Sequence, residues 1–411
     1  MKPAAVYISK TWLFVLIFME IALVSGAVDR YVVPPGTPGV VPSPNYTSWA
    51  TAGTNIQQVF NVCANTGDRL IVSNGTYHLW NNTALNFNKG VTVEAFGGEA
   101  VVNGNYPLSA NICLVMNSPA HGGLMVSGMT FSNGYGCGVQ LGFGILTNCN
   151  IRNSFSAIAS TPGGLWMPNT LGPNICAATA MNCRVFNNSN TNSGSSMGAG
   201  VLLQGTNSLL LDCRIFANTA LKAGGGGYAG GAGVGMEPGT MMRGCHISNN
   251  ISWYYGAGVR AIGPRTVVEG CLVSCNTGLV STVGGGFYAS DGVMIRDCVV
   301  SNNTAFSEGG ICMGSSVTVQ TSVVCYNRSE NDNGGLRLGN ACHVLNSTIG
   351  PSNRCAASRV GGAALMGSGS MISNCLIVGN YGREYAGGVH VTAGLLVNSI
   401  IASNICGINP G

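Results

Sequence analysis

The 411-residue sequence is poor in charged residues. Asp, Glu, Lys and Arg make up 8% of it, against about 25% in ordinary soluble proteins. The formal net charge of +4 is small and scattered, which argues against a nucleic acid as partner. Low charge together with 46% apolar residues also excludes intrinsic disorder, which requires low hydrophobicity and high net charge. The surface must therefore be covered by Asn, Ser, Thr and Gly.

Long apolar segments are missing after the N-terminal region, so no membrane span is expected there. The N-terminus itself is typical of an export signal. Lys2 and Lys10 precede a short apolar stretch over 12–24, and small residues then allow cleavage after Ala27. We therefore expect a cleaved signal peptide over 1–27, with an uncleaved anchor as the alternative. The expected location is secreted or cell-surface, extracellular or at a bacterial outer membrane.

Metal-binding cysteine pairs are also missing. The 17 cysteines include no Cys-x-x-Cys and have no regular histidine partner, so we expect neither a metal site nor a cofactor. In an exported chain, the ten cysteines outside the repeat described next could include a disulfide or two. They are Cys63, Cys113, Cys137, Cys176, Cys275, Cys312, Cys325, Cys342, Cys355 and Cys406.

One short motif recurs every 21 to 34 residues. It consists of a polar residue, Cys or Ser, any residue, Ile or Val, two further residues and Asn, as in NCRVFNN (182–188). The second position holds Cys149, Cys183, Cys213, Cys245, Cys271, Cys298 and Cys375, or Ser322, Ser347 and Ser399. The last position holds Asn188, Asn218, Asn250, Asn276, Asn303, Asn327, Asn353, Asn380 and Asn404. A fixed period of this length is typical of solenoid folds.

Glycine pairs recur in phase with this motif, each before a short apolar alternation, as in GGGF (284–287) and GGL (334–336). One pair creates a match to the dinucleotide-binding pattern G-x-G-x-x-G within GGGGYAGGAG (224–233). That pattern requires a following helix, whereas another copy of the repeat, GCHISNN (244–250), follows here. The match therefore reflects glycine density and not a nucleotide site.

Short apolar alternations separated by Gly and Asn indicate strands and turns. The density of Gly, Asn and Thr excludes helical repeats, and the pattern of leucine-rich repeats is missing. Three strands and three turns in roughly 26 residues make one coil of a parallel β-helix. We therefore predict an all-β, single-stranded parallel β-helix of about 12 coils. At roughly 4.8 Å per coil, the rod is about 60 Å long.

Stacking the coils brings equivalent residues into columns. We predict that the Cys/Ser column lines a narrow interior corner that admits only small side chains. The Asn column is predicted to form a turn ladder in which each amide bonds to the next coil and the residue tolerates a left-handed backbone.

The segment TNIQQVFNVCANTGD (54–68) is expected to cap the first coil, since an exposed strand edge invites aggregation. Its apolar residues recur at helical spacing, and Thr54 with Gln57 fits a capping box.

The predicted organisation has three parts: a signal peptide (1–27), a leader with the capping helix (28–67) and the β-helix (68–411). No comparable cap follows the last repeat, Ser399–Asn404. We therefore expect the C-terminal end to be a docking surface through which the protein self-associates.

The leader YVVPPGTPG (31–39) and the segment KGVTVEAFGGEAVVNGN (89–105) resemble the opening of bacterial secreted right-handed parallel β-helix proteins. The repeated Cys–Asn and Gly-Gly units are similar to those of polymorphic outer-membrane and autotransporter passenger proteins, which belong to the pectate-lyase-like superfold. The resemblance covers 31–411 and implies a right-handed coil. It implies no particular activity, because this coil serves adhesins, lyases and hydrolases alike.

Catalytic signatures of such proteins were sought and not found. The Asn-Thr-Asp, Asp-Asp and Gly-His-Gly motifs of polygalacturonase-like hydrolases do not occur. In the repeated motif, no column brings two carboxylates to adjacent coils, as glycoside cleavage requires. An enzyme, a polysaccharide lyase-like protein acting on an acidic polysaccharide, is therefore the less favoured alternative. An Arg within reach of two or more carboxylates in one groove would favour it.

One surface combines cationic and aromatic residues on successive coils. If the ladder Cys points inward, the next residue and the third point outward. Such groups stack on sugar rings and pair with uronate or sulfate groups; the alternative is that the phenylalanines only cover the sheet. The candidate ligand-binding residues are Arg152, Arg184, Phe186, Arg214, Phe216 and His246, with Trp253, Tyr254 and Tyr255 from a nearby turn.

We therefore predict an exported, non-catalytic β-helix protein of the cell surface or extracellular matrix. Its repetitive face would serve adhesion, glycan binding or self-association, with an acidic polysaccharide or another surface protein as partner.

Overall fold

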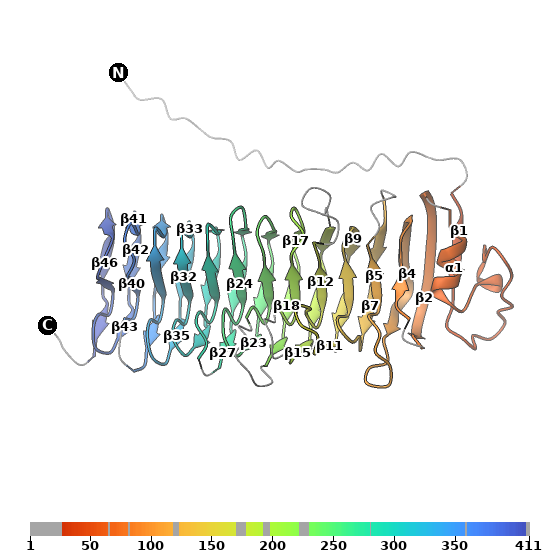
Figure 1. Cartoon of the computed structure of the whole chain (residues 1–411), viewed down its shortest axis with the longest axis horizontal. Coiled ribbons are helices and arrows are strands. Elements are labelled where there is room, and N and C mark those ends of the chain that lie inside the picture. Colours follow the sequence, from red (N-terminus) through yellow and green to blue (C-terminus); the bar gives the residue numbers. More distant parts are fainter. Residues whose placement is uncertain are drawn as a thin grey trace, which may run out of the picture.

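The computed structural model of the chain is a rod of stacked parallel coils (Figure 1). The residues described are 27–64, 66–80, 83–117, 123–169, 178–191, 198–221, 230–279, 281–357 and 360–407. Their strands form three parallel sheets of 25, 12 and 10 strands, called here the large, twelve-stranded and ten-stranded sheets. The predicted all-β parallel β-helix of about 12 coils is confirmed. The expected signal peptide, except Ala27, lies outside the described residues, as does Cys176.

From β9 (Gly144–Thr147) to β44 (Val389–Val391), each coil contains four short strands, one more than predicted. A representative coil runs through β21 (Met241–Arg243), β22 (His246–Ser248), β23 (Ile251–Ser252) and β24 (Val259–Ile262). The first two strands both belong to the large sheet and are separated by a bend, whereas β23 lies in the ten-stranded sheet and β24 in the twelve-stranded sheet. The extra strand arises because the bend before the ladder Cys divides one long strand into two.

Near the N-terminus this division is missing. β2 (Thr66–His78) and β4 (Gly90–Asn103) run along the large sheet without a break. β4 then pairs with both β6 (Met125–Ser127) and β7 (Met129–Ser132), so one strand faces two. The repeated bend therefore begins with the coil that contains β6 and β7.

Left-handed backbone positions make the two bends beside the second strand of each coil. The residue before the ladder Cys has a positive φ, as at Asn182 (52°) and Asp212 (50°). So does the residue before the ladder Asn, as at Asn187 (54°) and Asn249 (55°). Asn and Asp adopt this region more readily than other non-glycine residues. The prediction that the ladder Asn itself takes this conformation is wrong, because the preceding residue makes the turn.

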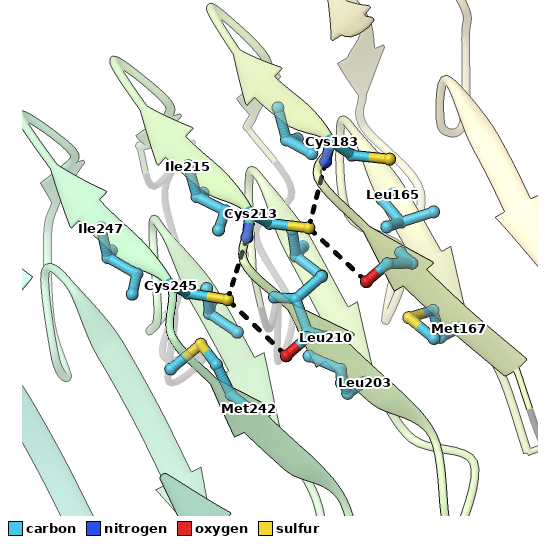
Figure 2. Close-up of a cluster of buried hydrophobic side chains, with 14 of the residues drawn as sticks. Leu165, Met167, Cys183, Leu203, Leu210, Cys213, Ile215, Met242, Cys245 and Ile247 are labelled. Atoms are coloured by element: carbon cyan, nitrogen blue, oxygen red, sulfur yellow. Dashed lines mark hydrogen bonds between the residues drawn. The ribbon is translucent and has the colours of Figure 1, made fainter. Parts of the chain in front are cut away.

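The Cys/Ser column is buried and hydrogen-bonded as well as small (Figure 2). The Cys183 amide donates to the Cys213 Sγ at 3.4 Å, and the Cys213 amide donates to the Cys245 Sγ at 3.4 Å. The Cys213 thiol in turn donates to the Ala180 carbonyl at 3.5 Å. A small side chain that both accepts and donates satisfies the backbone at this corner, and a hydroxyl does the same where Ser322 replaces Cys.

The ladder Asn side chains point inward and link each coil to the next. Asn218 has no exposed surface. Its Nδ2 donates to the Asn250 Oδ1 at 3.0 Å and to the Val185 carbonyl at 2.9 Å. Its Oδ1 accepts from both the amide and the Nδ2 of Asn188 at 3.0 Å. The same pattern repeats along the column. In each coil, the ladder Asn therefore satisfies buried backbone groups at the bend that follows the second strand.

A short helix, α1 (Ile56–Val62), covers the first coil at the N-terminal end of the rod (Figure 1). Val59 and Phe60 are fully buried, and the Phe60 ring stacks on Phe87 at 4.3 Å between centroids. The leader also adds β1 (Asp29–Val32), which pairs in parallel with β2.

The start of α1 differs from the prediction. Its N-cap is Asn55, whose side chain accepts from the Gln58 amide at 3.0 Å. The predicted capping box of Thr54 and Gln57 does not form, because the helix begins one residue later than that box requires.

The sixteen described cysteines are all free thiols, so no disulfide is found among them. Fourteen of them are buried, since only Cys275 and Cys406 have appreciable exposure. Along the described parts of the chain, no helix has the length and apolarity needed to cross a bilayer.

Candidate functional site

The predicted cationic and aromatic residues lie on adjacent strands of the large sheet. The strands are β14 (Arg184–Phe186), β18 (Arg214–Phe216) and β22. Their register places Arg184 beside Arg214 and Phe186 beside Phe216. The central residues of the same strands, Val185 and Ile215, are fully buried. The alternation of a strand therefore directs these Arg and Phe side chains to the outer surface.

Arg184, Phe186, Arg214 and Phe216 form what is called here the Arg–Phe patch. The two phenylalanine rings stack at 4.9 Å between centroids with 3° between their planes. The Arg184 guanidinium lies 5.3 Å from the Phe186 centroid and 5.6 Å from that of Phe216. Both arginines are exposed and both phenylalanines half-buried. Among the described residues, neither arginine forms an ion pair with a carboxylate.

His246 and Arg152 flank the patch. His246 follows Arg214 in the column; partial burial lowers the pKa of its imidazole, and the positive charge of Arg214 lowers it further. On the other side, Arg152 precedes Phe186 in register but forms an ion pair with Glu99 at 3.1 Å. The charge available to an anionic ligand is therefore concentrated on Arg184 and Arg214.

The predicted aromatic turn lies elsewhere on the coil. Trp253, Tyr254 and Tyr255 follow β23 in the segment that leads to the twelve-stranded sheet. The Tyr255 ring packs on Tyr288 at 4.6 Å, and Tyr255 bridges the backbones of the coils on either side. One bend and β23 thus lie between this turn and β22, the strand next to the Arg–Phe patch.

A second site, which the sequence did not indicate, lies between loops that enter the twelve-stranded sheet. It is a groove of about 500 Å³, called here the Glu308 groove. Glu308 lies between β31 (Thr304–Ala305) and β32 (Ile311–Ser315), and its backbone bridges to Asn333 on the next coil. The polar and aromatic residues that line the groove are Ser307, Glu308, Asp332, Asn333, Arg337, Tyr385 and His390.

Glu308 is a buried carboxyl group with few partners. It is 3% exposed. Its Oε1 lies 3.9 Å from the Arg337 Nε and 3.5 Å from the Asn333 Nδ2. Its Oε2 is buried and accepts no hydrogen bond from a nitrogen or oxygen donor among the described residues. The Cys312 thiol, a weak donor, also forms a hydrogen bond with the carboxyl group.

Burial raises the pKa of Glu308 to about 7. The positive charge of Arg337 lowers the pKa, the negative charge of Asp332 raises it, and hydrogen bonds from Asn333 and Cys312 lower it slightly. A carboxyl that changes its protonation near neutral pH inside a groove is suited to acid–base chemistry. The groove also contains Arg337 with two carboxylates in its electrostatic reach, the arrangement named above as favouring an enzyme.

Sequence reasoning missed the groove because it compared columns only within the Cys–Asn motif. Glu308, Asn333, Val360 and Ala386 instead occupy the position directly before the glycine pair on four successive coils. Those glycines are required where backbones approach closely: a Cβ on Gly310 would lie 2.2 Å from the Gly335 carbonyl oxygen. Comparison of the residues in this second column predicts that Glu308 and Asn333 are neighbours on adjacent coils.

No protein-family model matches the sequence, and no curated protein does. Several solved structures are similar in their coiled fold. A pectate lyase, Pel9A, has a TM-score of 0.42 at 15% identity over 84% of this chain and 78% of its own. The Dettilon tailspike protein has a TM-score of 0.43 at 14% identity, over 90% of this chain and 68% of its own. PfbA, a surface adhesin of Streptococcus pneumoniae, has a TM-score of 0.33 at 11% identity, over 77% of this chain and 84% of its own. Similarity at this level assigns no activity to this chain.

Proposed function

We propose that the protein is an exported β-helix protein that binds anionic glycans through the Arg–Phe patch. The observation that carries the proposal is the stacked pair of half-buried phenylalanines with two exposed arginines that form no ion pair with any described residue. In a chain with only 8% charged residues, such a concentration of cationic and aromatic groups on adjacent strands needs a reason.

The chemistry of the patch fits a sugar acid or a sugar sulfate. A guanidinium pairs with a carboxylate or sulfate through two parallel hydrogen bonds. The aromatic rings offer an apolar surface to the C–H groups of a sugar ring. The two arginines lie on adjacent coils, spaced by roughly 4.8 Å, so the patch can contact neighbouring groups of a polymer.

Retention on immobilised polygalacturonate and on a sulfated glycan tests this function. We expect Arg184→Ala with Arg214→Ala to weaken retention about tenfold without lowering the melting temperature, since two exposed charge contacts contribute about 1.4 kcal/mol together. Arg328→Ala with Arg354→Ala is the matched control, because these two arginines are also exposed and also lie on adjacent coils, in the ten-stranded sheet. Equal loss in both double variants would contradict a specific site.

Self-association through the last described coil is the second part of the proposal. Ile377 is fully buried, whereas Ile401, its neighbour in the same column, is 48% exposed. Leu395, Ile400 and Ile405 are also exposed there. Apolar surface of this kind favours contact with a second copy of the coil.

A further inference from the structure

We propose that the Glu308 groove is a second carbohydrate site, which hydrolyses a neutral glycosidic bond with Glu308 as the proton donor and Asp332 as the base for water. This activity does not rest on glycan binding at the Arg–Phe patch, because the patch belongs to the large sheet and the groove to loops at the twelve-stranded sheet.

The geometry of Glu308 makes it a proton donor. The carboxyl is 3% exposed, lines the groove and has one oxygen that no nitrogen or oxygen donor of the described residues reaches. An ionised carboxylate in such a place leaves an acceptor unsatisfied at a high cost, whereas the protonated form carries its own O–H donor. The burial that raises its pKa to about 7 keeps much of the group protonated at neutral pH, as a general acid requires.

The second carboxylate belongs to the neighbouring coil. Asp332 is half-buried, lines the same groove and acts electrostatically on Glu308. It directly precedes Asn333, which bridges to Glu308. Two carboxyl groups of unequal burial in one groove are the pair that glycoside hydrolysis uses.

The other lining residues fit a neutral sugar. Tyr385 is 61% exposed and stands 5.5 Å from the His390 ring between centroids, which gives a surface for a sugar ring to pack against. Arg337 contributes one positive charge and Asp332 one negative charge, while protonated Glu308 contributes none. The groove is therefore close to neutral overall and offers no surplus charge to a uronate or sulfate.

The proposed step conserves every atom. The bond between the anomeric carbon and the glycosidic oxygen breaks, its electron pair stays with that oxygen, and the oxygen takes the Glu308 proton. The oxygen of a water molecule bonds to the anomeric carbon, and Asp332 takes the proton that this water gives up. Exchange with solvent then returns a proton to Glu308 and removes one from Asp332, so that one water is consumed per bond.

The groups that face Glu308 set the pH dependence of this reaction. They are Arg337 on β36 (Leu336–Asn340), Asp332 and Asn333 in the loop before it, and Cys312 on β32. Tyr385 and His390 also line the groove. We expect the rate to fall as the pH rises through about 7, because the donor is then lost.

The test measures new reducing ends from arabinoxylan, β-glucan, galactan and galactomannan, and fluorescence from umbelliferyl glycosides of the same sugars. We expect the intact protein to release product from at least one probe. Glu308→Gln and Asp332→Asn should each lower the rate about 100-fold or more, and both variants should stay folded at the assay temperature, which circular dichroism checks. Glu330→Gln is the matched control, because Glu330 is exposed and does not line the groove; its rate should match that of the wild type.

The other outcomes overturn the proposal. Absence of product from every probe, an undiminished rate in Glu308→Gln, or an unsaturated product that indicates elimination would each exclude hydrolysis by Glu308. Product release from umbelliferyl glycosides and retention on polygalacturonate are separate measurements, so the loss of one does not require the loss of the other. A negative result for hydrolysis at the groove can therefore be distinguished from a negative result for glycan binding at the patch.

Discussion

The Arg–Phe patch and the Glu308 groove are built in different ways on the same rod. The patch consists of strand residues in register, each a fixed number of positions from a ladder Cys. The groove consists mainly of residues from loops between two sheets, held beside glycine pairs. The patch exposes its charges to solvent, whereas the groove buries its main carboxyl to 3% exposure. Regular strands therefore present groups for binding, and the loops supply the burial that changes the chemistry of a group.

The largest effect is expected in the ladder that supports the patch. Asn218→Ala removes an amide that bonds to Asn188, Asn250 and the Val185 carbonyl, and it leaves buried partners unsatisfied. We expect a loss of about 3–5 kcal/mol in the free energy of unfolding, measured by denaturant titration. Asn404→Ala is the comparison, since Asn404 is only half-buried in the last described coil; an equal loss in both would mean that the ladder does not act through burial.

The pH dependence of stability distinguishes the groove from the patch. A carboxyl whose pKa rises from 4.5 to about 7 on folding stabilises the fold below pH 4.5, and this contribution is lost as the pH rises to about 7. The total is about 3 kcal/mol at most. We therefore expect Glu308→Gln to become more stable than the wild type as the pH rises through this range. Denaturant titrations across the range measure the difference, and parallel curves for the two proteins would contradict a raised pKa.

Replacing the patch aromatics separates binding from simple coverage of the sheet. Phe186→Leu with Phe216→Leu keeps an apolar cover but removes the rings, so we expect retention on polygalacturonate to fall several-fold, by about 1 kcal/mol. Phe306→Leu, at an exposed position outside the patch, serves as control. Unchanged retention in the double variant would show that the phenylalanines only cover the sheet.

The smallest effect is expected at the last described coil. Ile401→Lys places a charge on the exposed end of the apolar column and should lower the sedimentation coefficient at high protein concentration, because it weakens contact between copies. Val41→Lys, at a residue that is 74% exposed near the other end, should have no effect. A wild-type protein that stays monomeric at high concentration would rule out this association.

The coil could be predicted from the sequence because its physical causes are local. The left-handed bend before the ladder Cys selects Asn, Asp or Gly, a narrow corner selects Cys or Ser, and a buried ladder selects Asn, so all three leave a periodic signal. The fourth strand was missed because the polar residue or glycine before the ladder Cys was taken as part of one continuous strand, although its left-handed backbone bends the chain there.

The patch was predictable for the same reason, since Arg184 and Phe186 keep a fixed offset from Cys183. The Glu308 groove was missed because its residues lie outside the Cys–Asn motif, and the column before the glycine pairs places only Glu308 and Asn333 together. Cys312 and Arg337 do share a register position on the strands that follow, but neither belongs to the Cys–Asn motif. The effect of burial on Glu308 depends on several loops at once, and no single sequence window contains it.

A crystal structure of the protein with an oligogalacturonate tests the central claim most directly. We predict that a uronate carboxylate lies within hydrogen-bond distance of Arg184 or Arg214, with a sugar ring against Phe186 or Phe216. An oligosaccharide bound only at other arginines, such as Arg328 and Arg354, or not bound at all, would contradict the account.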